Sequence, residues 1–291
     1  MTVTPLTSHA TVHTGAGTAP AFRGRIGRDA RSGHYAVPGR YRLHLSTACP
    51  DGLRIAVVHS LLGLGTDCPV TFLPAVPDDP ERGHAVLRPL YEASAHRYPG
   101  PALGPVLSDA WSGRIVSTHA PDITRDLSRL GGTGPAPYPH GADSEIEAVE
   151  RMCRQGVDEA AQRAGAAQGE QDDRDDALDT LLETLGALDR WLDGRAYMLR
   201  EHLTAADAEV WTTLVHLDTV HRQHLDATAV HRIADHPALW SYARRITAHP
   251  AFGTHLDLDG VERRHRARCR GLESAGAAVR ILDWPAHTVR P

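Results

Sequence analysis

A cysteine followed by proline, Cys49-Pro50, is the pair of residues with the clearest chemical potential in this chain. It lies between a short apolar segment (42–46) and an apolar stretch with helical character (53–64). Proline is favoured at the first helical position, and the partial positive charge and N–H groups of a helix N-terminus favour thiolate over thiol. We therefore predict that Cys49 is a nucleophilic or redox cysteine. Asp51 opposes ionisation of that thiol and also fits the ordinary role of an acid in the first helical turn.

Three histidines, His216, His221 and His224, lie close together further along the chain. His221 and His224 are three residues apart, a spacing that metal ligands use on a helix. With 19 histidines in the sequence such a group arises easily by chance, and we expect no metal. His221 is a candidate acid or base, because imidazole titrates near neutrality.

Composition excludes several classes of function. The 291 residues are 41% apolar, enough for one large core or two smaller ones, and the net charge of −5 gives no basic field for nucleic acid. All 31 basic residues are arginine, no apolar run is long enough to cross a bilayer, and residues 1–20 show no secretory signal. The four cysteines form no CxxC pair, so neither a disulfide framework nor a zinc ribbon is expected. We expect a cytoplasmic protein with a small-molecule substrate and no nucleic-acid or membrane partner.

The elements around Cys49 follow a strand–helix–strand order (41–46, 53–64, 70–73). A hairpin (104–107 and 114–116) comes next, with Ser117-Thr118 as the predicted N-cap of the following helix. After a Gly- and Pro-rich linker the pattern is helical, and Thr204 with Asp207 forms a predicted capping box. The sequence thus predicts a small α/β domain followed by an all-α domain.

From about Phe22 to about Leu282 the chain resembles the Xi class of glutathione transferases, the glutathionyl-hydroquinone reductases. The motifs that carry this resemblance occur in the family's order: Pro38-Gly39-Arg40-Tyr41-Arg42-Leu43, Ala48-Cys49-Pro50, Leu61-Leu62-Gly63-Leu64, Gly113-Arg114-Ile115-Val116, Leu203-Thr204-Ala205-Ala206-Asp207 and Pro237-Ala238-Leu239-Trp240.

The resemblance implies a glutathione-transferase fold, with an N-terminal thioredoxin-like domain and a C-terminal helical domain, and a homodimer. The boundaries we expect are an N-terminal arm (1–40), the thioredoxin-like domain (41–130), a linker (131–142), the helical domain (143–260) and a C-terminal tail (261–291).

The resemblance also assigns roles to site residues. It makes Cys49 the residue that attacks the sulfur of a glutathionyl thioether. It places Pro105 where thioredoxin-like folds carry a cis-proline, with Gly104 offering its backbone to the thiol cofactor. Pro50, Thr118 and His119 complete the expected cofactor-binding residues.

The chain departs from the family at both of these places. The family's Cys-Pro-Trp-Ala is Cys49-Pro50-Asp51-Gly52 here, and its Asn-Glu-Ser-Ala is replaced by Ser117-Thr118-His119-Ala120. The carboxylate that would pair with the ammonium group of glutathione is therefore missing, although Thr118 and the helix N-terminus can still hold an anion. The cofactor expected from the resemblance is glutathione or another low-molecular-weight thiol such as mycothiol.

The family's substrate-pocket tyrosines are also replaced. Asn-Gly-Val-Tyr becomes Gln155-Gly156-Val157-Asp158, and His-Tyr-Tyr becomes Arg264-His265-Arg266. Where the family has Arg and Tyr, this chain has His216 and His221. The expected pocket residues are Asp158, His216, His224 and His265.

Three functions follow as hypotheses. The first is thiol-dependent transfer, or reductive dethiolation, of a quinone-like or other small electrophile through Cys49. The second is an enzyme of specialised metabolism on the same fold that catalyses thiol-independent isomerisation, cyclisation or elimination, with Asp51, His119 and His221 as acid/base groups. The third is a non-catalytic binding protein, because a fold alone does not fix a function.

Overall fold

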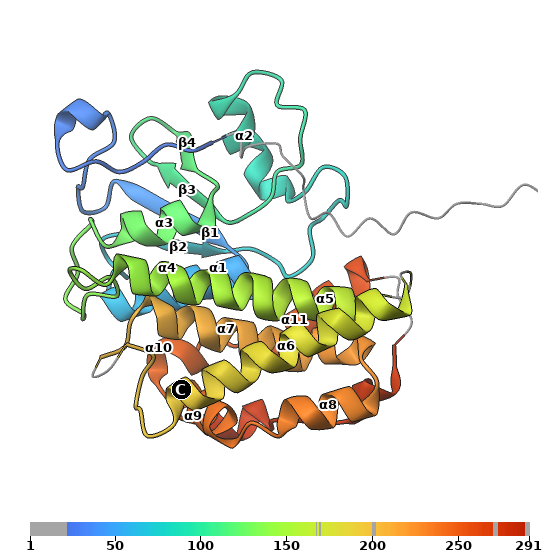
Figure 1. Cartoon of the computed structure of the whole chain (residues 1–291). Coiled ribbons are helices and arrows are strands. Elements are labelled where there is room, and N and C mark those ends of the chain that lie inside the picture. The colour runs from blue at the N-terminus through green and yellow to red at the C-terminus, as the bar shows by residue number, and fades with distance from the viewer. Residues whose placement is uncertain (1–21, 167, 169, 200–201, 270–272, 289–291) are drawn as a thin grey trace, which may run out of the picture.

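The computed structural model describes residues 22–166, 168, 170–199, 202–269 and 273–288. Its sheet has four strands in the order β2-β1-β3-β4 (Figure 1). The strands are β1 (Tyr41–Leu45), β2 (Val70–Phe72), β3 (Val106–Asp109) and β4 (Arg114–Ser117). Strand β1 runs parallel to β2 and antiparallel to β3, and β3 is antiparallel to β4. This mixed sheet is the one that a thioredoxin-like domain requires.

Helices cover both faces of the sheet. Successive residues of a strand point to opposite faces, so β3 and β4 contribute side chains to both cores. Leu107 and Val116 face the core that includes α1 (Pro50–Leu62) and α3 (Ala120–Leu127). Val106 and Ile115 face the other way, toward η2 (Ala85–Leu87) and α2 (Arg88–Ser94).

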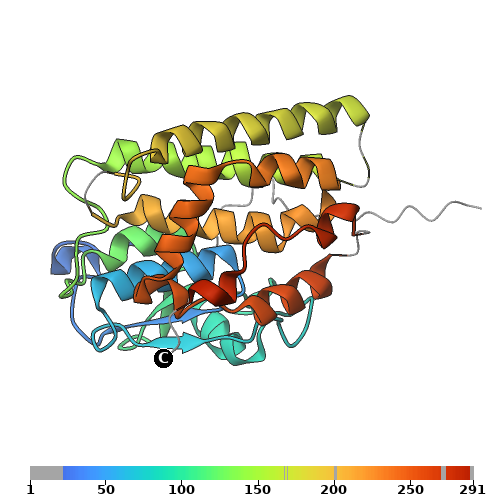
Figure 2. The same cartoon turned by 90° about the horizontal axis from the view of Figure 1, so that it is seen from below.

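The second half of the chain is helical and packs beneath α1 (Figures 1 and 2). A continuous helix is formed by α4 (Asp143–Arg151), the π-helical segment η3 (Met152–Glu159) and α5 (Ala160–Ala164). The central helix α7 (Ala205–Thr219) is almost entirely buried and contacts α1. The remaining helical elements are η1 (Ala30–Ser32), α6 (Gln171–Leu192), η4 (His221–His224), α8 (Ala227–Ala234), α9 (Pro237–Thr247), α10 (Pro250–Gly253), α11 (Leu258–Arg268), η5 (Ala275–Ala278) and η6 (Trp284–His287).

The start of α7 confirms the predicted capping box, since Thr204 and Asp207 cap each other's backbone. The same carboxylate also accepts hydrogen bonds from the Met198 N–H and the Tyr242 hydroxyl, both at 2.8 Å. Asp207 therefore ties three segments of the helical half together.

Several predicted boundaries differ from the structure. The N-cap of α3 is His119 instead of Thr118. Helix α6 begins at Gln171, within a segment whose small polar residues favour a loop. Helix α11 runs across the expected boundary between residues 260 and 261, so the predicted tail begins inside a helix. Local propensity cannot fix these ends, because tertiary contacts stabilise the terminal turns.

The described part of the N-terminal arm is also anchored. Arg23 bridges Ser117 of β4, and the Ile26 side chain is fully buried. Arg25 forms ion pairs with Asp122 and Asp126 of α3 at 3.1 and 2.8 Å. Residues 22–27 therefore line the sheet edge instead of forming a separate arm.

Candidate functional site

Cys49 is the N-cap residue of α1. The Cys49 backbone is extended (φ −112°, ψ 136°), and Pro50 follows in the first turn of the helix. The carbonyl oxygen of Cys49 accepts a hydrogen bond from the Leu53 N–H at 2.8 Å. The residue is half-buried. This is the placement that the sequence predicts, with the side chain at the positive end of the helix.

Gly52 explains how the helix approaches the strand so closely. A Cβ at this position would overlap the Ser46 carbonyl oxygen, which belongs to rigid backbone. The alanine that the resembled family carries here therefore does not fit without a shift of α1 or of the end of β1.

The Gly104–Pro105 peptide bond is cis, as predicted. It lies against the same end of β1: a Cβ at Gly104 would be 3.2 Å from the His44 carbonyl oxygen and 3.7 Å from the Leu45 Cα. The cis bond therefore lies against the end of the strand that precedes the Cys49 turn.

Asp51 pairs with an arginine instead of standing alone beside the thiol. The Arg54 guanidinium lies 2.8 Å from the Asp51 carboxylate and also forms an ion pair with Glu209 of α7. Burial acts against the charge of Arg54, yet Glu209 and Asp51 raise its pKa, so it stays protonated. The carboxylate of Asp51 is 48% exposed and serves this bridge between the two halves of the chain.

Asp158 and His221 face each other across the predicted substrate pocket. Asp158 belongs to the π-helical segment η3, a type of distortion that is frequent at functional sites. Its Oδ1 lies 4.0 Å from His221 Nε2, which is too far for a hydrogen bond.

The protonation states of this pocket are unusual. Burial and the nearby Glu209 raise the pKa of Asp158 to about 8, although water screens part of this effect, since 31% of the side chain is exposed. Burial lowers the pKa of His221 to about 4 and that of His216 to about 3. At neutral pH the pocket therefore holds a protonated carboxyl group beside two neutral imidazoles. His216 Nε2 is buried with no hydrogen-bond partner among the described residues.

Helix α11, in the C-terminal part of the chain, packs against the segment that precedes Cys49. Its Val261 packs with Ala48 and Ala75 in a small apolar cluster, and Arg264 donates to the Ala75 carbonyl at 3.1 Å. Arg268, further along α11, interacts electrostatically with Cys49.

Thr118 and His119 lie between β4 and α3. Thr118 donates its N–H to the Phe22 carbonyl at 3.1 Å, and His119 Nδ1 lies 3.0 Å from Asp122. Burial favours the neutral form of Asp122, but its hydrogen bond from Arg23 and the charge of Arg25 outweigh burial and hold its pKa low. His119 is thus paired to a carboxylate already neutralised by arginines.

Two further predicted pocket residues, His224 and His265, do come together, with their Nε2 atoms 3.1 Å apart. Sequence reasoning missed four residues beside this pocket: Arg54, Glu209, Arg268 and Cys269. One signal was available, because Arg264 and Arg268, like His265 and Cys269, are four residues apart and so share a helical face.

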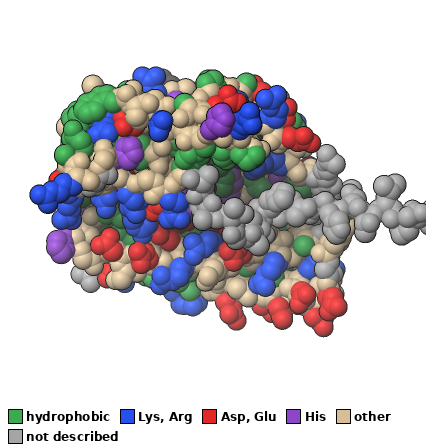
Figure 3. Space-filling model, turned by 90° about the horizontal axis from the view of Figure 1, so that it is seen from above, with side chains coloured by type: hydrophobic (Ala, Val, Ile, Leu, Met, Phe, Trp, Pro, Cys, Tyr) green, Lys and Arg blue, Asp and Glu red, His purple; other side chains and the backbone are tan. Residues whose placement is uncertain are grey.

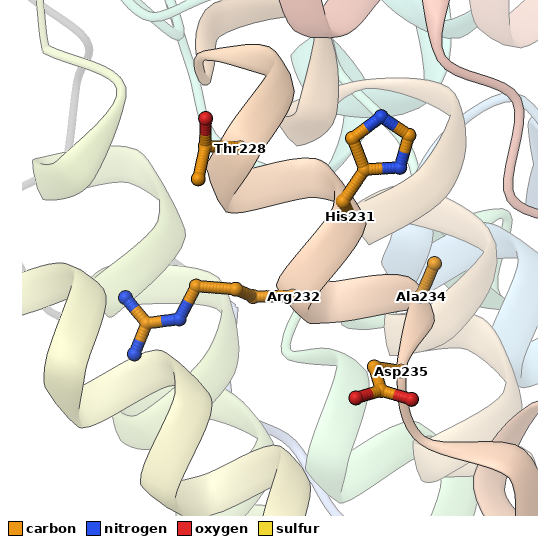
Figure 4. Close-up of a pocket in the computed structure, with 5 residues that line it drawn as sticks. All are labelled: Thr228, His231, Arg232, Ala234 and Asp235. Atoms are coloured by element: carbon orange, nitrogen blue, oxygen red, sulfur yellow. The ribbon is translucent and has the colours of Figure 1, made fainter.

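The surface offers a depression elsewhere that does not build a site. Its lining residues, Thr228, His231, Arg232, Ala234 and Asp235, belong to the α8 region, and their side chains point in different directions (Figure 4). Arg232 is directed to Asp179 of α6 at 3.9 Å. On the face shown in Figure 3, basic and acidic side chains of the described residues are interspersed over most of the surface. Within the described ranges no helix is long and apolar enough to cross a membrane.

Comparisons with known proteins agree with this geometry. Residues 147–245 match the family model for the glutathione S-transferase C-terminal domain. The chain is 29% identical over 252 residues to the glutathionyl-hydroquinone reductase PcpF of Sphingobium chlorophenolicum, covering 80% of this chain and 79% of that protein. It is 27% identical over 292 residues to YqjG of Escherichia coli K12, which has the same activity name, covering 92% and 88%.

Solved structures give the same result. The glutathione-bound structure of YqjG superposes with a TM-score of 0.73 at 28% identity, covering 86% of this chain and 88% of that one. A Xi-class glutathione transferase from Natrialba magadii shares the fold, with a TM-score of 0.73 at 23% identity over 92% of this chain and 91% of that one. The chain thus has the glutathione transferase fold and is a homologue of the glutathionyl-hydroquinone reductases of the Xi class.

Proposed function

We propose that this protein is a thiol-dependent reductase that removes a thiol from a quinone-like thioether through Cys49. The single observation that carries the proposal is the position of Cys49, which is the N-cap residue of α1 with Pro50 in the first helical turn. The homologues named as glutathionyl-hydroquinone reductases support this assignment.

In the first step the Cys49 thiolate attacks the thioether sulfur. A disulfide forms between Cys49 and the released thiol, while the carbon–sulfur bond breaks and its electron pair passes to the ring carbon. That ring carbon takes up one proton, and the product is released as the hydroquinone. A second thiol then attacks the mixed disulfide, regenerates Cys49 and leaves as a disulfide, so the two thiols are oxidised and the thioether is reduced.

The pocket residues take complementary parts. Arg268 places a positive charge within electrostatic range of Cys49. The protonated Asp158 carboxyl donates a hydrogen bond to a substrate oxygen, where the resembled family uses a tyrosine. The neutral His221, facing Asp158 at 4.0 Å, accepts a hydrogen bond from the same substrate.

We propose that the thiol is glutathione or a related low-molecular-weight thiol, with mycothiol as the rival. The Gly104–Pro105 backbone and Thr118 are the proposed binding groups. His119 cannot supply the carboxylate that an ammonium group would need, and its partner Asp122 is already neutralised. The residues of this chain therefore favour a thiol whose recognition does not depend on an ammonium group. The homodimer implied by the resemblance stays a prediction.

The decisive experiment is mass spectrometry of the intact protein after incubation with glutathionyl- and mycothiyl-hydroquinone. We expect one thiol adduct on Cys49, release of hydroquinone, and loss of both in Cys49→Ser. Turnover that persists in Cys49→Ser would overturn the proposal and favour thiol-independent acid/base chemistry by Asp158 and His221. Saturable binding without any turnover would instead favour the non-catalytic reading.

A further inference from the structure

We propose that His224, His265 and Cys269 form a binding site for a zinc ion, next to the Cys49 pocket. Among the described residues these three side chains are the only group of histidine, cysteine and carboxylate ligands close enough to share one ion, with all ligand atoms within 4.8 Å of one another. The proposal does not depend on the reductase function.

The distances between the ligand atoms fit one tetrahedral ion. His224 Nε2 lies 3.1 Å from His265 Nε2 and 3.5 Å from Cys269 Sγ. Zinc–nitrogen bonds of about 2.05 Å and zinc–sulfur bonds of about 2.3 Å at tetrahedral angles require separations of about 3.3 and about 3.6 Å respectively. The two separations from His224 thus match a tetrahedral ion to within a few tenths of an ångström, and the third pair lies within 4.8 Å.

The backbone holds the ligands in place from both sides. His265 lies in the last turn of α11 and Cys269 is its C-cap, with the Cys269 N–H donated to the His265 carbonyl at 2.7 Å. Four residues apart, their side chains leave the same face of the helix.

His224, at the end of η4, is fixed by the chain that returns after α11. Ser274 donates to the Gln223 carbonyl at 2.7 Å and Gly276 to the Leu225 carbonyl at 3.0 Å, one bond on each side of His224. On the opposite side Gly165 leaves just enough room, since a Cβ there would be 2.8 Å from the His224 Cβ. The site is thus preorganised by segments far apart in the sequence.

The donor set selects the class of ion. Imidazole and thiolate together suit zinc and copper, whereas calcium and magnesium require oxygen ligands. Three protein ligands leave one tetrahedral position for water or for an oxygen or sulfur atom of a small molecule, which is the pattern of zinc sites that keep an open position. The site adjoins the substrate pocket, because His224 and His265 both act electrostatically on His221.

The test is metal titration of the full, tag-free chain, reduced, stripped with a chelator and kept without oxygen. With zinc and a competing chromophoric chelator we expect one ion per chain. With cobalt as a spectroscopic probe we expect tetrahedral d–d bands and a thiolate-to-cobalt charge-transfer band in the near ultraviolet.

Variants locate the ion. Loss of an outer partner of a metal ligand costs about 10- to 100-fold in affinity, so His265→Ala and Cys269→Ala should weaken zinc binding by at least about 100-fold. Cys269→His should retain binding and lose only the charge-transfer band. His231→Ala, an exposed histidine of α8, and Cys49→Ser serve as matched controls and should bind as tightly as the wild type.

Circular dichroism checks that each variant is folded. Absence of stoichiometric binding by the wild type would refute the site, as would affinity that survives both alanine variants. A cobalt spectrum without the thiolate band would remove Cys269 from the ligand set and overturn the proposal as stated. Loss of binding in Cys49→Ser would place the ion at the other cysteine.

Discussion

Replacing Asp158 by asparagine tests the protonation state on which the pocket chemistry depends. In the folded protein burial and Glu209 raise the pKa of this carboxyl to about 8, from an ordinary value of 3.8. The folded state thus retains a proton that the unfolded chain releases near pH 4. Stability contributed by this proton is fully present below pH 4 and is lost as the pH rises to 8.

The size of the effect follows from the width of that window. Each pH unit is worth about 1.4 kcal/mol, so an upper limit is about 6 kcal/mol between pH 4 and pH 8. Because 31% of the Asp158 side chain is exposed, solvent screening reduces this value, and we expect about 4–5 kcal/mol, which still keeps the carboxyl group largely protonated near neutral pH. Asparagine does not titrate. The free energy of unfolding of the variant minus that of the wild type should therefore rise between pH 4 and pH 8 and stay constant above pH 8.

Urea unfolding at intervals from pH 4 to pH 9 measures the difference. Asp179→Asn, whose side chain is 69% exposed, is the control and should follow the wild type at every pH. Parallel stability curves for Asp158→Asn and the wild type would refute the reasoning, because they would mean that Asp158 is ionised in the folded protein at neutral pH.

The remaining predictions concern other parts of the site. Gly52→Ala should lower the free energy of unfolding in urea by about 1–3 kcal/mol despite the better helix propensity of alanine, because the new Cβ overlaps the Ser46 carbonyl; unchanged stability would show that α1 can shift. Arg268→Gln should slow alkylation of Cys49 by iodoacetamide at pH 7 about threefold or more, since a positive charge that interacts electrostatically with Cys49 is lost; an unchanged rate would argue against that interaction. Asp207→Ala should lower the melting temperature strongly, at a cost of about 3–5 kcal/mol, because it leaves buried donors of Met198 and Tyr242 unsatisfied; a loss below about 1 kcal/mol, measured by thermal unfolding, would contradict this.

The sequence by itself determined the elements that depend on local rules. Cys49-Pro50 marks a helix start because proline has no N–H to lose in the first turn, and Thr204 with Asp207 marks another because their side chains satisfy free backbone donors. The resemblance to the Xi-class family, carried by the order of motifs along the chain, implied the glutathione-transferase fold and the cis bond at Pro105.

Only the tertiary structure decided what surrounds the sulfur. The pairing of Asp51 with Arg54 and Glu209 joins α1 to α7, and the approach of Arg268 to Cys49 joins α11 to α1. The group of His224, His265 and Cys269 likewise depends on a chain return that no local pattern specifies. Charges and ligand atoms act through space over a few ångströms, so their partners, and the pKa values that follow, are set by packing between segments distant in the sequence.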